Sequence, residues 1–241
     1  MSTAGVLVIG NEILSGKVVD TNSPFLASEL RTLGVDLQRI LTIPDEVEII
    51  AREVRVMSEA YDYVFTSGGI GPTHDDVTME AVAQAFDRGV ELSQSMYERI
   101  ERAQGRPPNE SQRKMAMVPE GSQSVDAGDL WFPVVIVENV HIFPGIPKLL
   151  EKKFVSIRDR FTGVPFRLRR IYVTRRESDI ADHLHGLLAE FPELMLGSYP
   201  RLDRQDYMVL LTLESRDADY LQRAQDSLLE RLPSDAVHKV E

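Results

Sequence analysis

The chain has 241 residues, 43% of them hydrophobic and 27% charged, which is enough to bury the core of one large domain or of a large and a small one. Its net charge of −11 argues against nucleic-acid binding, and the lack of cysteine excludes disulfides and thiolate metal sites. No signal-peptide pattern and no apolar run of membrane-spanning length is visible, so we expect a cytoplasmic protein that does not bind membranes.

Strands and helices alternate in the first part of the chain. Ala4 to Ile9 is a short apolar run that ends at a glycine, as a buried strand would. Asn22 begins an amphipathic segment that ends at Gly34, a residue suited to a helix C-terminus. We predict strands at 4–9, 35–43 and 62–66 and helices at 24–33, 47–57 and 76–86. This alternation is typical of a parallel sheet with helices on both faces.

The second half contains a hairpin and then a domain boundary. Residues 134–137 and 140–143 are expected to form the hairpin, and Pro147 begins a helix. The segment "TGVPF" marks the boundary, so we predict domains at 1–164 and 165–241. The second domain has the element order β-α-β-β-α, which indicates a small α+β fold.

The segment "TSGGIGPTHDDVT", from Thr66 to Thr78, follows the third predicted strand. Gly68, Gly69 and Gly71 allow the backbone to approach a ligand closely, and a glycine turn before a helix favours an anion such as phosphate. The pattern is neither the dinucleotide fingerprint nor a Walker loop. A tight turn without a ligand is the alternative interpretation.

Two adjacent acids, Asp75 and Asp76, follow this loop. Acids at a helix start stabilise the helix without any further function, which is one explanation for them. Beside a phosphate they would repel the ligand unless a divalent cation lay between. If a phosphate binds here, we therefore expect Mg²⁺, Mn²⁺ or Co²⁺ with it.

Four motifs in the same order resemble the molybdopterin-binding fold. They are "GNEILSGKVVDTN", "TSGGIGPTHDDVT", "FPGIP" and "LGSYP". The nearest branch is the N-terminal domain of competence/damage-inducible protein A, which is similar to the N-terminal domain of eukaryotic FAD synthase. The resemblance implies a three-layer α/β/α domain with a mostly parallel sheet, a small α+β domain, and a homo-oligomer. The segment "FPGIPKLL" departs from the damage-inducible pattern toward the FAD synthase branch.

The resemblance also implies an activity, namely metal-dependent hydrolysis of FAD or ADP-ribose to AMP and a second phosphate product. Asp45 and Asp76 would hold the metal and, with Glu12, act in catalysis. The dinucleotide or pterin ligand would contact Asn11, Asp20, Gly68, Gly69, Gly71, Thr73, Asp75, Gly145 and Pro147.

Several alternatives stay open at this point. The chain could be a molybdopterin or nucleotide binding module without turnover, or an oligomer whose site has decayed. Capping of a helix is the preferred explanation for Asn22. Trp131 and Tyr199 are candidates to stack on a flavin or adenine ring, although such residues more often pack in a core or a turn.

Overall fold

The computed structural model describes residues 2–128, 132–233 and 235–241. The chain divides into two compact units, Met1–Gly163 and Val164–Glu241, which we describe separately. In the described part of the chain, no helix combines the length and the apolar character needed to cross a membrane.

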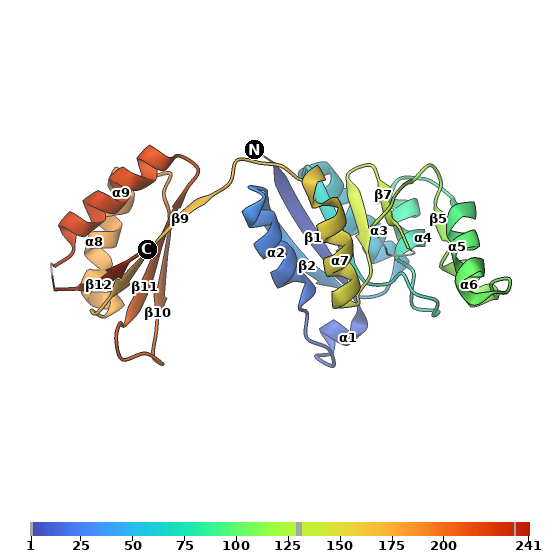
Figure 1. Cartoon of the computed structure of the whole chain (residues 1–241), viewed down its shortest axis with the longest axis horizontal. Coiled ribbons are helices and arrows are strands. Elements are labelled where there is room, and N and C mark those ends of the chain that lie inside the picture. Colours follow the sequence, from blue (N-terminus) through green and yellow to red (C-terminus); the bar gives the residue numbers. More distant parts are fainter. Residues whose placement is uncertain (1, 129–131, 234) are drawn as a thin grey trace. The chain divides into compact units, whose positions relative to one another are not determined.

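The first unit contains a six-stranded sheet with the order β2-β1-β3-β8-β7-β6 (Figure 1). Its parallel strands are β1 (Thr3–Ile9), β2 (Asp36–Ile43), β3 (Tyr63–Ser67) and β8 (Val140–Phe143). β7 (Val134–Val137) forms the expected antiparallel hairpin with β8, and β6 (Gln123–Val125) pairs antiparallel with β7. The predicted mostly parallel sheet and the predicted hairpin are confirmed.

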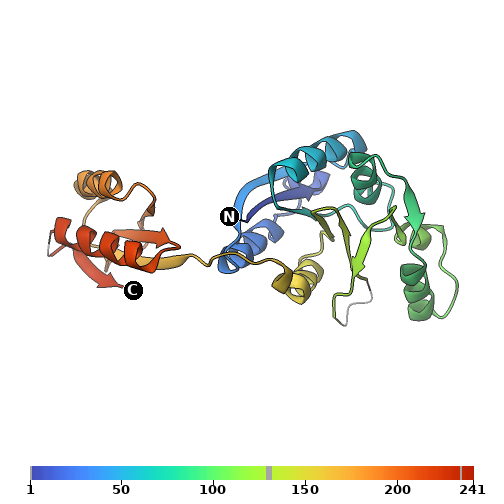
Figure 2. The ribbon, with the colours of Figure 1, turned by 90° about the horizontal axis from the view of Figure 1, so that it is seen from above.

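Helices cover both faces of this sheet. Figure 2 shows α3 (Val47–Ala60) and α4 (Thr78–Ala85) over one face, and α2 (Asn22–Thr32) and α7 (Pro147–Ile157) over the other. The predicted three-layer α/β/α arrangement is therefore confirmed.

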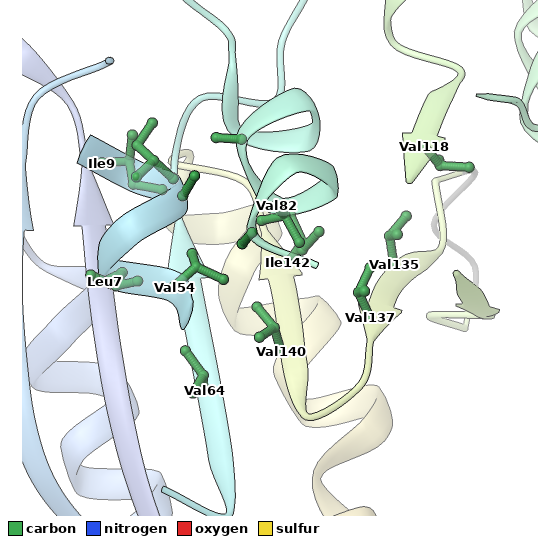
Figure 3. Close-up of a cluster of buried hydrophobic side chains, with 14 of the residues drawn as sticks. Leu7, Ile9, Val54, Val64, Val82, Val118, Val135, Val137, Val140 and Ile142 are labelled. Carbon is green, nitrogen blue, oxygen red and sulfur yellow. The ribbon is translucent and has the colours of Figure 1, made fainter. Parts of the chain in front are cut away.

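The apolar run of β1 explains why both faces must be covered. Alternate side chains of a strand point to opposite faces, so Leu7 packs with α3 and α4 while Val6 packs with α2 and α7. Figure 3 shows the first of these clusters, with Leu7 near Val54 of α3 and with Val82 of α4 beside Ile142 of β8.

Several short elements were not predicted. They are α1 (Asn11–Leu14), the paired strands β4 (Val90–Leu92) and β5 (Met117–Pro119), α5 (Gln94–Gln104), α6 (Glu110–Lys114), β6 and the 3₁₀ turn η1 (Arg158–Arg160). Strands of three residues are too short to show a periodic pattern. The helix that was predicted to begin at Asp76 begins instead at Thr78, because the side chain of Asp76 accepts a hydrogen bond from the preceding loop, at the N–H of Thr73.

The second unit is an antiparallel sheet with helices on one face. Its strand order is β10-β11-β9-β12, with β9 at Arg167–Val173, β10 at Met195–Pro200, β11 at Val209–Ser215 and β12 at Val237–Val240. Helices α8 (Glu177–Glu190) and α9 (Ala218–Arg231) pack against it through residues such as Ile180 and Leu228. The small α+β fold is confirmed, and β12 was not predicted.

Candidate functional site

The candidate site lies at the carboxyl ends of the four parallel strands, where open α/β sheets bind ligands. Gly10 follows β1, and its N–H donates to Ile43 at the end of β2 (3.1 Å). The glycine loop follows β3, and the N–H of Gly68 donates to Phe143 at the end of β8 (3.1 Å). The predicted site residues that follow these strands thus lie at one edge of the sheet: Asn11 and Glu12 after β1, Asp45 after β2, the glycine loop after β3 and Gly145 after β8.

The glycine loop can be built only with glycine at its first two positions. Gly68 has φ +109°, and a Cβ there would lie 2.1 Å from the carbonyl oxygen of Ile9. Gly69 has φ +66°, and its Cβ would lie 2.3 Å from Thr78 Oγ1. That hydroxyl donates to the Gly68 carbonyl (2.9 Å). Glycine is therefore required at both positions, because other atoms of the protein occupy the space that a Cβ would need.

Asn22 joins two of these loops from the start of α2. Its side chain is buried, and Nδ2 donates to Ser67 Oγ and to the Gly145 carbonyl, each at 2.8 Å. Asp20 instead bonds the first N–H groups of the helix: its Oδ1 accepts hydrogen bonds from the N–H groups of Asn22 (2.9 Å) and Ser23 (3.1 Å). The interpretation of Asn22 as a cap is therefore wrong, because its amide reaches across the sheet edge.

The acidic residues interact electrostatically around Asp45. Partial burial raises the pKa of the Asp45 carboxyl, and the N–H of Asn11, which donates to Oδ2 (2.8 Å), opposes that shift. The negative charges of Glu12, Asp75 and Asp76 raise this pKa further. A cation placed among them would relieve the repulsion.

Thr73 organises the two adjacent acids. Its N–H donates to Asp76 Oδ2 (2.8 Å), and its hydroxyl lies 2.5 Å from both Asp76 Oδ2 and Asp75 Oδ1. The hydrogen bond from Thr73 lowers the pKa of the Asp75 carboxyl. Within residues 2–128, 132–233 and 235–241, no three or more His, Asp or Glu side chains are grouped to hold a metal. Metal binding by Asp45 and Asp76 stays a prediction.

A cavity of about 490 Å³ opens at this sheet edge. Its lining includes acids and glycines, namely Glu12, Gly68, Gly69, Gly71, Asp76 and Gly145. Mostly apolar residues complete the lining: Ile70, Pro72, Met115, Phe132, Pro144, Ile146, Leu149 and Lys153. The cavity thus combines acids and exposed glycines with apolar side chains and one lysine.

Some of the predicted contact residues do not line this cavity. They are Asn11, Asp20, Asp45, Thr73, Asp75 and Pro147. Sequence reasoning missed Met115, Phe132, Leu149 and Lys153, which belong to no ligand-binding motif. A lysine within the apolar stripe of a helix, next to Phe154, was the one available signal for Lys153. Trp131 lies outside the described residues, and Tyr199 is a half-exposed residue of β10 in the second unit.

Comparison with known proteins identifies both units. Residues 5–160 match the protein family described as "Probable molybdopterin binding domain", and residues 165–241 match the family described as "FAD synthase, middle domain". A crystal structure of CinA from Thermoplasma acidophilum, a protein of unknown function, is similar with a TM-score of 0.62 and 28% identity, over 66% of this chain and 98% of that one.

Two relatives extend over nearly the whole chain. A protein of Caenorhabditis elegans named "Probable FAD synthase" is 34% identical over 98% of this chain and 51% of its own length. A "CinA-like protein" of Citrifermentans bemidjiense is 32% identical over 94% of this chain and 57% of its own length. The chain thus spans about half the length of these relatives.

These names correct the expected enzyme class. Two nematode relatives are named FAD synthases, and a synthase of FAD is a nucleotidyltransferase, which forms a diphosphate bond. The prediction of a nucleotide pyrophosphatase, which would hydrolyse such a bond, is therefore wrong. The motifs misled because phosphate and cation binding serve transfer and hydrolysis alike.

The family resemblance inferred from the motifs is confirmed by both matches. The chain belongs to the molybdopterin-binding domain family, in the branch that carries the FAD synthase middle domain and includes CinA-like proteins.

Proposed function

We propose that this chain binds a flavin or pterin nucleotide in the cavity at the carboxyl edge of its first sheet. The observation that carries the proposal is the mixed lining of the cavity. The glycine loop, Glu12 and Asp76 contribute glycines and acids, and Phe132 and Leu149 are among its apolar residues. A ligand that joins a phosphate to a flat heterocycle suits such a lining.

The phosphate belongs on the glycine loop. Gly68, Gly69 and Gly71 line the cavity at the end of β3, and α4 begins shortly after, at Thr78. Backbone N–H groups and the positive end of a helix dipole favour an anion at such a turn.

A divalent cation would accompany this phosphate. Asp76, which lines the cavity, is one carboxylate suited to hold it; Asp45 lies outside the lining but near enough for the charge of Asp76 to raise its pKa, and is the second candidate. Mg²⁺ is usually bound by one or two carboxylates together with phosphate oxygens and waters, so a closed set of protein ligands is not required. The cation would neutralise the repulsion between the acids and the ligand phosphate.

A second candidate function is adenylyl transfer onto a flavin phosphate, favoured by the FAD synthases that match nearly the whole chain. In that reaction the phosphate of FMN attacks the α-phosphorus of ATP, a new diphosphate bond forms, and pyrophosphate leaves. Glu12 and Asp76 would then face the reacting phosphates, and the cation would neutralise their charge.

Isothermal titration of the purified chain with FAD, FMN and AMP, with Mg²⁺ or with EDTA, tests the proposal. We expect FAD and FMN to bind more tightly with Mg²⁺. Asp76→Asn should reduce this Mg²⁺ dependence, whereas Asp75→Asn should reduce it less, since Asp75 is exposed and does not line the cavity. Failure of FAD and FMN to bind under either condition would overturn the proposal.

The same protein separates the two candidate functions. Incubation with FMN, ATP and Mg²⁺, followed by chromatography, shows whether FAD and pyrophosphate form. Product formation that Asp76→Asn abolishes supports adenylyl transfer, whereas flavin binding without product supports a binding module. Size-exclusion chromatography of the same samples tests the predicted homo-oligomer.

A further inference from the structure

Lys153 is a buried lysine of α7 that lines the cavity. Only 3% of the residue is exposed, and Nζ donates hydrogen bonds to the carbonyl oxygens of Phe132 (2.6 Å) and Pro133 (2.7 Å). Nζ also lies 5.8 Å from the centre of the Phe132 ring. Phe132 and Pro133 precede β7, which β8 separates from β3 and its glycine loop in the sheet.

The positive charge of Lys153 has no acidic partner in the part of the chain that the structure describes. Burial lowers the pKa of the Lys153 ammonium to about 8, and the other contribution comes from a second cation, Arg99. An ammonium group has three N–H donors, and two backbone carbonyls accept two of them. Among the described residues, one donor of this costly buried charge is thus left for another acceptor.

We propose that Lys153 selects the ring of the bound cofactor by donating this hydrogen bond to a ring carbonyl oxygen. The inference rests on the proposed function and names the ring chemistry that the same cavity prefers. Lys153 is thus a specificity residue, placed where the apolar wall of Phe132 and Leu149 would hold a flat ring.

The chemistry of an ammonium group explains the preference. Flavin and pterin rings carry carbonyl oxygens on their pyrimidine part, whereas adenine carries an amino group there and accepts hydrogen bonds only through its ring nitrogens. An ammonium group only donates hydrogen bonds, so at that edge of the ring a carbonyl meets it favourably and an amino group does not. The cavity should therefore favour flavin and pterin rings over adenine.

The test compares two lysines of the same helix. Lys153→Met removes the ammonium group but keeps an unbranched apolar side chain, and Lys152→Met makes the same change at an exposed position. Titration calorimetry gives the Kd of each variant for FMN, riboflavin and AMP. We expect Lys153→Met to bind FMN and riboflavin roughly 10- to 100-fold more weakly, which is the usual contribution of a hydrogen bond to a charged group. Lys152→Met should change neither Kd.

AMP identifies the part of the ligand that Lys153 contacts. If Lys153 contacts the ring, AMP affinity stays within roughly twofold in Lys153→Met, because a contact that AMP does not make cannot be lost. If Lys153→Met bound FMN and AMP more weakly but kept its affinity for riboflavin, Lys153 would contact the phosphate, and the inference would be overturned. Unchanged affinity for all three would show that Lys153 only links α7 to β7, which also overturns it.

A second variant guards against misfolding. Lys153→Gln keeps N–H donors without the charge, and it should retain part of the preference for FMN over AMP while melting close to the wild type. If Lys153→Met does not fold, a reduced or lost preference in Lys153→Gln supports the inference, and an undiminished preference overturns it. Failure of the wild type to bind FMN or FAD would instead overturn the proposed function itself.

Discussion

The side-chain amide of Asn22 donates a 2.8 Å hydrogen bond to the carbonyl oxygen of Gly145, across 123 residues of sequence. The same nitrogen donates to Ser67 Oγ at the end of β3. Gly145 in turn lies against the glycine loop, since a Cβ on it would be 3.4 Å from the Cα of Gly68. One buried amide thus holds together two walls of the cavity.

Asn22→Ala should lower both stability and ligand affinity. The Gly145 carbonyl and the Ser67 hydroxyl lose a buried partner, which costs about 1–3 kcal/mol of unfolding free energy. Urea unfolding and FMN titration measure the two effects. Thr21→Ala is the matched control, because Thr21 is exposed and makes no capping bond, so it should change stability by less than about 0.5 kcal/mol. Equal losses in both variants would contradict the role assigned to Asn22.

Gly68→Ala should disrupt the loop, whereas Gly16→Ala should not. Both glycines have positive φ, +109° and +71°, so alanine is strained at each, by about 1–2 kcal/mol. At Gly68 the added Cβ also meets the Ile9 carbonyl at 2.1 Å, whereas nothing lies within 4 Å at Gly16. Thermal melting should show a much larger loss for Gly68→Ala. Similar melting temperatures for the two variants would contradict the close packing of Gly68 against the Ile9 carbonyl.

Asp45→Asn and Asp62→Asn should have opposite effects on stability at neutral pH. Burial and neighbouring acids raise the pKa of Asp45, so the folded state disfavours its charge, and the Asn variant should be more stable without metal. The N–H and hydroxyl of Thr3 lower the pKa of Asp62, so that Asn variant should be less stable.

The direction of each pKa shift sets how the stability difference between the Asn variant and the wild type depends on pH. Both carboxyls have an ordinary pKa of 3.8, and both differences should shrink as the pH falls toward and below that value, because the wild-type groups then become neutral. Urea unfolding at low ionic strength between pH 7 and pH 3 measures them. A stabilising Asp62→Asn or a pH-independent gain in Asp45→Asn would contradict the assignment.

His141 should make the protein less stable as the pH falls from neutral. Its ring is buried, stacked on Phe65 at 5.4 Å and edge-on to Phe161 at 4.9 Å, and burial lowers its pKa to about 4 from 6.5. Between these values the unfolded chain holds a proton that the folded chain lacks. Stability should therefore fall by on the order of 3 kcal/mol across that window.

Unfolding curves at pH 7 and pH 5 test this dependence. His141→Phe keeps an aromatic ring in the cluster and removes the titration, so its stability should change less between the two pH values. His185→Gln, at an exposed position of α8, should behave like the wild type. If the loss of stability between pH 7 and pH 5 persisted unchanged in His141→Phe, a group other than His141 would cause it.

Local patterns explain how far the sequence alone predicted the fold. The apolar run at Ala4 to Ile9 and the helical spacing at Val47 to Met57 each depend on neighbours within a few residues, so β1 and α3 were predicted close to their observed bounds. Three-residue strands such as β4 carry too little pattern, and β12 was missed although it pairs with β9.

The glycine loop, the acids beside it and the family could be predicted from the amino-acid sequence, because turn chemistry and motif order follow from neighbouring residues. The folded structure was needed to show that Asn22 joins the ends of β3 and β8, and that Phe132 and Lys153 complete the cavity. These side chains come from segments far apart in sequence that meet because parallel strands place their carboxyl ends at one edge of a sheet. The expected hydrolase was wrong for a related reason, since a phosphate site is local whereas the reaction depends on what else is assembled around it.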